Sequence, residues 1–433
     1  MSTAVTQTDQ PPQPAKKGNY FQQSGWVLAC TMMGGVFFWA VHFCARKMPP
    51  SEYGIVGTLL QVLNQMAIPA MGLQTIFVQE AALSQSEEHR RELAGAVRAV
   101  AKATFLLWVA AVVAVFFFQQ DIIINYKITN PVALWATVAM GLTSLWLPML
   151  NGIMLGRENF FWYGLNSMLV AFSRLVLVGL IVFVFGGYAA GTMVAVVLAM
   201  SVGVGIGIWQ TFHLWTGPAT PFVWKPWLKR IVPLTFGAGA TTFMFTFDMI
   251  AVQRFLPDSG IYAAAGMICR AIMFLVAPLV LVMFPKIVQS AAKAERTDVL
   301  GKALGATALI AIMAALGATF FAKIPILIVQ GRDYIDAAKL VPLFTWCILP
   351  LTVSNVLINN LLARQQYKVV PWLVLVAIGY MVTLWTPLGH NSFWNVIYSL
   401  GIFAVLYFLV CFWFTWRAKG QPAPAAQAPA TAS

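Results

Sequence analysis

Long apolar runs alternate with short polar breaks along almost the whole chain, and this alternation constrains the fold more than any other feature. An α-helix needs about 20 apolar residues to cross the hydrocarbon core of a bilayer, which is about 30 Å thick. Runs of this kind occupy the following residues: 24–44, 54–78, 99–118, 132–156, 160–186, 188–213, 231–253, 261–284, 300–324, 336–362, 368–389 and 393–416. The pattern predicts an all-α integral membrane protein with about twelve transmembrane helices in two pseudo-symmetric six-helix bundles.

The composition supports the same fold class. Of the 433 residues, 60% are hydrophobic and 9% are charged, and the net charge is +13. Soluble domains carry roughly 25% charged residues, so this chain could not cover a soluble surface. We predict a disordered cytoplasmic tail at 1–20, an N-terminal bundle at 21–215, a cytoplasmic linker at 216–230, a C-terminal bundle at 231–417 and a second disordered tail at 418–433.

The basic residues predict the orientation of these spans. With both termini inside, eighteen lysines and arginines fall in cytoplasmic segments: Lys16, Lys17, Arg90, Arg91, Arg98, Lys102, Arg157, Lys225, Lys229, Arg230, Lys286, Lys293, Arg296, Lys302, Arg364, Lys368, Arg417 and Lys419. Seven fall outside: Arg46, Lys47, Lys127, Arg254, Lys323, Arg332 and Lys339. Positive charge is enriched on the cytoplasmic side of membrane proteins, so both termini are expected in the cytoplasm and the net charge does not indicate nucleic acid.

A short motif, Val-Gln-x-Ala-Ala, occurs at 78–82 and again at 288–292. Each copy follows a Gly-Ile pair and a mid-helix proline, Pro69 or Pro278, in the second span of its half. The two halves are therefore diverged copies of one design. Each copy leads into a charged helical stretch, 86–103 or 293–306, which is either a solvated connector or an interfacial helix that couples the halves. Parallel six-helix repeats of this kind are a transporter design, with the substrate site between them near mid-membrane.

A few charged residues lie within or next to the predicted spans, where charge is costly and suggests function. Arg174 lies in the fifth, Asp248 in the seventh and Arg270 in the eighth, whereas Arg46 and Lys47 lie at the outer end of the first. Arginine stays protonated, so each guanidinium needs water, a carboxylate or an anionic ligand. Arg270 is either a buried partner of Asp248 or part of a cationic surface that binds phosphate. No acidic residue lies in the spans of the first half, which favours a ligand-facing or solvent-facing Arg174.

Two rows of amides share helix faces at spacings of three and four residues. Gln61, Asn64 and Gln65 lie on the second span, and Asn355, Asn359 and Asn360 lie on the tenth. Amides suit hydroxyl-rich sugars, and they also link helices to one another, so both roles stay open. The five cysteines have no paired spacing and the four histidines are scattered, so we predict no metal site and no catalytic residue.

Residues 248–292, "DMIAVQRFLPDSGIYAAAGMICRAIMFLVAPLVLVMFPKIVQSAA", resemble the polysaccharide flippases of the MOP transporter superfamily. The resemblance rests on Asp248, Pro257, Gly260, Ile261, Tyr262, Ala263 and Pro278, and Tyr53 and Gly54 match the first outside turn of that family. It implies a V-shaped pair of bundles that moves lipid-linked oligosaccharide of the undecaprenyl-diphosphate type across the cytoplasmic membrane by alternating access, for polysaccharide export. The diphosphate would then meet Arg174 and Arg270, with Asp248 balancing the charge.

Two other functions remain as alternatives. A cation-coupled multidrug exporter of the MATE kind would have the same architecture, but such exporters rely on embedded carboxylates, which the first half lacks. A membrane glycan polymerase would need a sizeable outer loop, and the longest here, around 323–339, is short, so we expect no enzyme. No cofactor is expected, and coupling to a proton or sodium gradient stays open. The expected partners are the lipid-linked substrate, the bilayer and, as a further option, a polymerase or export machinery.

Overall fold

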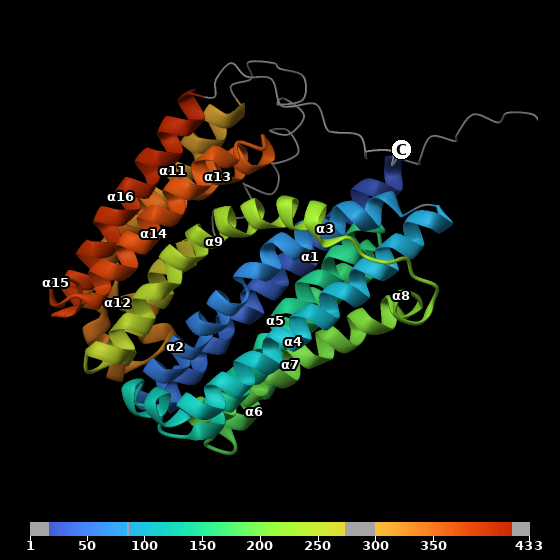
Figure 1. Ribbon diagram of the computed structural model, residues 1–433. Coiled ribbons are helices and arrows are strands. Elements are labelled where there is room, and N and C mark those ends of the chain that lie inside the picture. Colours follow the sequence, from blue (N-terminus) through green and yellow to red (C-terminus); the bar gives the residue numbers. More distant parts are fainter. Residues whose placement is uncertain (1–16, 85, 273–298, 418–433) are drawn as a thin grey trace, which may run out of the picture.

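The computed structural model describes residues 17–84, 86–272 and 299–417, and this part of the chain is almost entirely helical (Figure 1). The first half contains α1 (Lys17–Ala40), η1 (Val41–Lys47), α2 (Pro50–Met66), α3 (Ile68–Leu83), α4 (Glu87–Asn125), α5 (Pro131–Gly156), α6 (Phe160–Phe183), α7 (Tyr188–Gln210) and α8 (Phe212–Thr216). The second half contains α9 (Trp224–Phe255), the helix Ser259–Ile272, α11 (Val299–Phe320), α12 (Lys323–Val329), η2 (Arg332–Lys339), α13 (Val341–Ala363), η3 (Tyr367–Val369), α14 (Val370–Trp385), α15 (Pro387–His390) and α16 (Phe393–Arg417).

The helices form two lobes that converge at one end and diverge toward the other (Figure 1). In the N-lobe, built from α1 to α8, α5 packs against α3 and α7, and α1 packs against α6. In the C-lobe, built from the second half, α13 packs against both α11 and α16. We call the end that carries η1, α12 and η2 the convergent end, and the end that carries α8 the divergent end.

Helix α9 connects the two lobes. It contacts α2 and α3 of the N-lobe and also α13, α14 and α16 of the C-lobe. At its start, Trp227 and Ile231 belong to a buried cluster of N-lobe residues, and Arg230 binds Glu80 and Gln79 of α3 at 2.7 and 2.8 Å. The first copy of the repeated motif therefore anchors α9 to the N-lobe, while the second copy lies outside the described residues.

The lobes touch tightly at the convergent end. A Cβ at Gly260 would overlap the carbonyl oxygen of Pro50, and a Cβ at Gly54 would overlap Ser259. Polar bonds also cross between the lobes here, because Tyr334 Oη donates to Met48 O at 3.0 Å. Two further bonds join the lobes, from Lys127 Nζ to Leu256 O at 2.7 Å and from Gln253 Nε2 to Tyr126 O at 2.8 Å. Since a side chain larger than hydrogen cannot fit at either glycine, the convergent end is closed in this conformation.

Most predicted spans match observed helices, but the second does not. It was expected to be one helix containing Pro69, whereas α2 and α3 meet at Ala67 with a bend of 43°. Proline lacks the N–H that would continue the hydrogen-bond ladder and is favoured in the first turn of a helix, which is where Pro69 lies in α3. The corresponding part of the second half, including Pro278, lies outside the described residues.

Other boundaries also differ from the prediction. The charged stretch after the first motif is no separate connector: it forms the first half of α4, which is 39 residues long and is capped by Ser86. Part of the predicted linker is helical, because α9 begins at Trp224, and α1 begins at Lys17, inside the expected N-terminal tail. The predicted span 336–362 starts too early, since η2 carries the ion pair between Asp336 and Lys339 and α13 begins only at Val341.

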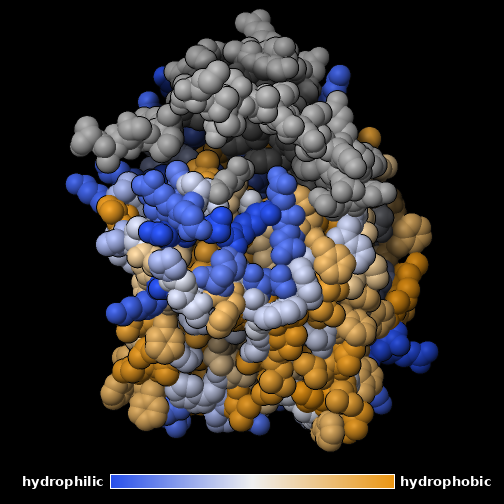
Figure 2. All heavy atoms as spheres, turned by 90° about the vertical axis from the view of Figure 1, so that its right-hand side faces the viewer, coloured by the Kyte–Doolittle hydropathy of each residue, from blue (hydrophilic) through white to orange (hydrophobic). Residues whose placement is uncertain are grey.

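The surface is typical of a membrane protein. Among the described residues, ten helices are long and apolar enough to span a bilayer, and the bent pair α2–α3 makes an eleventh. The apolar helix Ser259–Ile272 begins where the eighth span is predicted, and its continuation lies outside the described residues. Figure 2 shows the N-lobe face, where hydrophilic side chains gather toward the divergent end and apolar side chains cover much of the remainder.

We predict that Gly260→Ala destabilises the protein, because the added methyl group would meet the backbone of Pro50. Overpacking costs about 1–3 kcal/mol, so the midpoint of thermal unfolding in detergent should fall. Gly205→Ala in α7 is the matched control, since its Cβ would meet no atom within 4 Å. Alanine favours helix over glycine by about 1 kcal/mol, so this control should be neutral or stabilising. Equal unfolding temperatures for the two variants would contradict the closure.

Candidate functional site

The C-lobe buries an ion pair between α9 and the next helix. Arg270 Nη2 lies 2.6 Å from both carboxylate oxygens of Asp248, which is fully buried. Tyr262 donates its hydroxyl to Asp248 Oδ2 at 2.6 Å, and Arg270 Nε donates to Phe245 O at 2.7 Å. The structure therefore agrees with one of the two interpretations of Arg270, namely a buried pair with Asp248.

Helix geometry explains how Arg270 reaches this carboxylate. Side chains in a helix point back toward its N-terminus, and Arg270 runs over Gly266, where a Cβ would overlap its guanidinium. The guanidinium also lies over the ring of Phe344, 5.4 Å from its centroid. Both oxygens of Asp248 and two of the three guanidinium nitrogens of Arg270 are engaged inside the protein, so these two side chains bind each other in this conformation.

Arg174 is placed differently. It lies in α6, facing α1 inside the N-lobe, and only 4% of its surface is exposed. Its guanidinium carbon is 4.2 Å from the centroid of the Phe38 ring, and its Nε and Nη2 have no hydrogen-bond partner among the described residues. The lack of an acidic partner agrees with the sequence, but the guanidinium is enclosed and does not face an open surface.

Arg46 and Lys47 lie at the convergent end. Arg46 Nη2 donates to Leu327 O at 3.2 Å and also to Ile328 O, both near the C-terminus of α12. Carbonyls in the last turn of a helix lack intrahelical partners and carry partial negative charge, so a cation is favourable there. Arg46 thus ties the N-lobe to the C-lobe, whereas Lys47 is exposed.

The amide rows are partly engaged with their own helices. Asn64 donates to Gln61 at 2.9 Å, and Asn359 donates to Asn355. Gln65 reaches α9, where its Nε2 donates to Thr246 Oγ1 at 2.6 Å. Asn360, in contrast, is buried and accepts a hydrogen bond from Arg364. The other five amides remain partly accessible to a ligand. Asn64 is exposed, and four are half-buried: Gln61, Gln65, Asn355 and Asn359.

Sequence reasoning missed two tyrosines that complete these polar groups. Tyr53 at the start of α2 bonds His42 Nδ1 at 2.8 Å, just as Tyr262 bonds Asp248 in the C-lobe. Each tyrosine adjoins the Gly-Ile pair of the repeat, as Tyr53-Gly54-Ile55 and Gly260-Ile261-Tyr262. The repeat could have identified them, because both halves place a tyrosine beside a titratable residue from the preceding helix.

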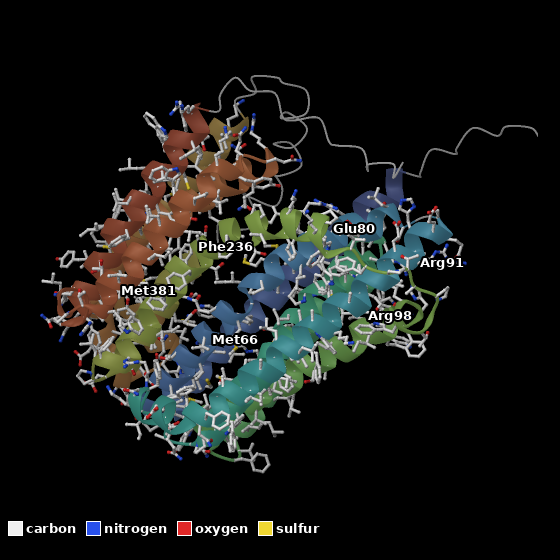
Figure 3. The ribbon with its side chains drawn as sticks, in the orientation of Figure 1. Met66, Glu80, Arg91, Arg98, Phe236 and Met381 are labelled. Carbon is white, nitrogen blue, oxygen red and sulfur yellow. The ribbon has the colours of Figure 1, made fainter. Side chains whose placement is uncertain are left out.

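Basic side chains gather at the divergent end, outside the spans. Arg98 caps α8 by donating to Leu214 O at 3.1 Å and also to Gly217 O, and Arg157 contacts His213 (Figure 3 labels Arg98). Burial, followed by the charges of Arg157 and Arg90, lowers the pKa of His213. His213 is therefore neutral at physiological pH and can accept a hydrogen bond from Arg157.

Comparison with known proteins tests the fold. No protein-family model matches the chain, and no curated protein matches it in sequence. Solved structures do match. An inward-facing multidrug resistance MATE transporter of the MOP superfamily is similar with a TM-score of 0.73 and 12% identity, covering 91% of this chain and 97% of its own. The chain has the fold of the MOP-superfamily transporters.

A second match is the lipid II flippase MurJ in an inward closed conformation, with a TM-score of 0.70 and 14% identity over 91% of this chain and 87% of that one. An outward-facing MATE transporter scores lower, at 0.59 with 14% identity over 94% of this chain and 99% of that one. These matches confirm the predicted all-helical membrane fold with twelve helices. At such identities they carry no information on substrate.

We predict that the Asp248–Arg270 pair behaves as one energetic unit. Asp248→Asn or Arg270→Met alone leaves one buried charge unpaired, which costs about 3–5 kcal/mol of unfolding free energy. The double variant removes both charges. Its loss of unfolding free energy should be smaller than the sum of the losses in the two single variants, by roughly 0.5–3 kcal/mol. Denaturant unfolding of the solubilised protein measures all three.

Tyr262→Phe is the matched control for this cycle. It removes one hydrogen bond from Asp248 and leaves the ion pair in place, so its loss should be only about 1 kcal/mol. Strictly additive losses in the Asp248 and Arg270 variants would show that the two side chains are not coupled.

Proposed function

We propose that this protein is a transporter that moves lipid-linked oligosaccharide, of the undecaprenyl-diphosphate type, across the cytoplasmic membrane by alternating access. The main support is the arrangement of two repeat-related lobes that are tied together at one end and diverge at the other. This arrangement allows a site between the lobes to be exposed to one side at a time. We place the termini and the divergent end in the cytoplasm, following the distribution of basic residues.

The higher TM-score against an inward-facing structure than against an outward-facing one supports this assignment of the conformation. The cycle then requires the convergent end to open, which means separating Gly260 from Pro50 and releasing Tyr334 from Met48. The half-exposed amides of α2 and α13 are the residues that we assign to the sugar, since amides match hydroxyl groups as both donors and acceptors. In this proposal Arg174 and the Asp248–Arg270 pair act as supports within their lobes, whereas the exposed Arg46 and Lys47 supply positive charge at the convergent end.

The second candidate is a cation-coupled exporter of the MATE kind, and the fold favours it as much as it favours a flippase. The state of Asp248 argues against it. Asp248 is fully buried seven residues before the end of α9, and it is bound by Arg270 and Tyr262. A carboxylate that must bind and release a proton or sodium ion needs access to that ion, and this one has none in the present conformation.

Reconstitution separates the two candidates. Proteoliposomes that contain a fluorescent lipid-linked oligosaccharide should expose it to an added impermeant quencher faster than protein-free vesicles do. A proton or sodium gradient should drive no uptake of lipophilic cations. Gradient-driven efflux of such cations that is lost in Asp248→Asn, without movement of the lipid-linked sugar, would overturn the flippase.

We predict that a disulfide across the convergent end stops transport. Because a Cβ at Gly331 would lie 3.7 Å from Arg46 Cγ across the two lobes, the pair Arg46→Cys and Gly331→Cys can be joined by oxidation in a Cys347→Ser background. Transport by the oxidised protein should fall at least tenfold, and a reducing agent should restore it. The two single-cysteine variants, treated with the same oxidant, are the controls. Full transport by the cross-linked protein would contradict alternating access at this end.

A further inference from the structure

Each lobe buries an arginine, and the partners of the two arginines differ. In the C-lobe, Arg270 has a carboxylate, Asp248, which also accepts a hydrogen bond from Tyr262. In the N-lobe, Arg174 is buried more deeply than Arg270, but Tyr53, beside the Gly-Ile pair, bonds an imidazole, His42. The N-lobe therefore buries an arginine, on α6 and not on the helix after the Gly-Ile pair, and has a tyrosine beside that pair, but it lacks the negative charge.

An unpaired guanidinium in an apolar interior is costly. It cannot lose its proton, and burying an ion without a counter-charge costs several kcal/mol. Nε and Nη2 of Arg174 both lack an acceptor in the described part of the chain, and the face of Phe38 at 4.2 Å compensates only part of the charge. Helix α6, which carries Arg174, packs against η1, which carries His42, and an imidazole supplies no negative charge. Every orphaned atom of this group is a donor, so the missing partner is an acceptor.

The enclosure of Arg174 limits the size of that acceptor. Only 4% of the residue is exposed. Arg174 lies nine residues before the end of α6 at Phe183, which is about 14 Å along the helix from the convergent end. A diphosphate that carries a lipid and a sugar cannot reach a guanidinium enclosed between α1 and α6. A monatomic ion or water can.

We propose that the N-lobe binds a small inorganic anion of the halide class, such as chloride, at the guanidinium of Arg174 beside the His42–Tyr53 pair. The anion supplies Arg174 with the negative charge that the carboxylate of Asp248 supplies to Arg270. It neutralises the buried charge and links α6 to α1 and η1. This site is separate from the transported molecule, and its test requires no transport.

The experiment uses the full-length protein in nanodiscs, with sodium gluconate as the starting medium and sodium held constant. Sodium chloride or bromide should raise the midpoint of thermal unfolding saturably, by roughly 3 °C or more at a hundredfold excess over the dissociation constant. Sodium sulfate and pyrophosphate should give no such rise, because these anions are too large to enter. No halide-dependent rise, or a rise with pyrophosphate alone, overturns the proposal; water would then be the partner of Arg174 in the first case and a substrate phosphate in the second.

The proposal also predicts whether Arg174→Met stabilises or destabilises the protein. Without halide, this variant should be at least as stable as the natural protein, because it removes an uncompensated charge, and it should gain nothing from chloride. If a partner within the protein already satisfies Arg174, the variant is instead destabilised equally in both media, which overturns the proposal.

Arg254→Gln is the matched control, since Arg254 lies at the end of α9 against the rings of Tyr126, Phe255 and Trp385, and it should keep the chloride response. Should Arg174→Met fail to fold, Arg174→Lys keeps the charge and loses the planar fork. Its half-saturating chloride concentration should then rise about tenfold, and an unchanged concentration would count against the site.

Discussion

A guanidinium inside an apolar helix bundle must be given a partner, because it cannot lose its proton and a buried charge without a counter-charge or an acceptor is costly. This constraint shapes both lobes. In the C-lobe it fixes α9 to the helix Ser259–Ile272 through Arg270, Asp248 and Tyr262, and it makes Gly266 necessary so that the arginine can lie flat along its own helix. In the N-lobe the same demand is left open at Arg174, which has aromatic contact but no acceptor among the described residues.

Helix α9 carries one ion pair near each of its ends, and the two pairs bind it to different lobes. Its first turns are bound to α3 through Arg230, Glu80 and Gln79, while Asp248 lies near its other end in the core of the C-lobe. A helix with one end in each lobe must bend, shift or release a contact when the lobes move. The ion pair between Arg230 and Glu80 is partly exposed and therefore weak, whereas the Asp248–Arg270 pair is buried. Relative motion should therefore loosen the start of α9 before it disturbs Asp248.

The sequence was a reliable guide where a single physical requirement decides the outcome. Twelve apolar runs identify the spans because the bilayer sets their length, whereas the pair of Asp248 and Arg270 was one of two interpretations that the sequence left open. The break at Ala67 and the length of α4 were missed, since a proline permits either a kink or a new helix and a charged helix can continue out of the membrane without a break. The enclosure of Arg174 depends on packing between α1 and α6, which no local pattern encodes. Tyr53 and Tyr262 were quoted as family matches, yet their bonding partners emerge only in three dimensions.

The choice between a flippase and an ion-coupled exporter depends on which charges can move. A proton-coupled or sodium-coupled exporter needs a carboxylate that alternates between free and occupied states. In the described spans Asp248 is held by three short hydrogen bonds, and the equivalent place in the N-lobe carries His42 beside an arginine. Among the described residues, Arg270 is thus neutralised by Asp248, whereas Arg174 has no carboxylate. A cargo that carries its own negative charge needs no free carboxylate in the lobes for its recognition, which is the physical reason to propose a diphosphate-linked lipid rather than a cationic drug.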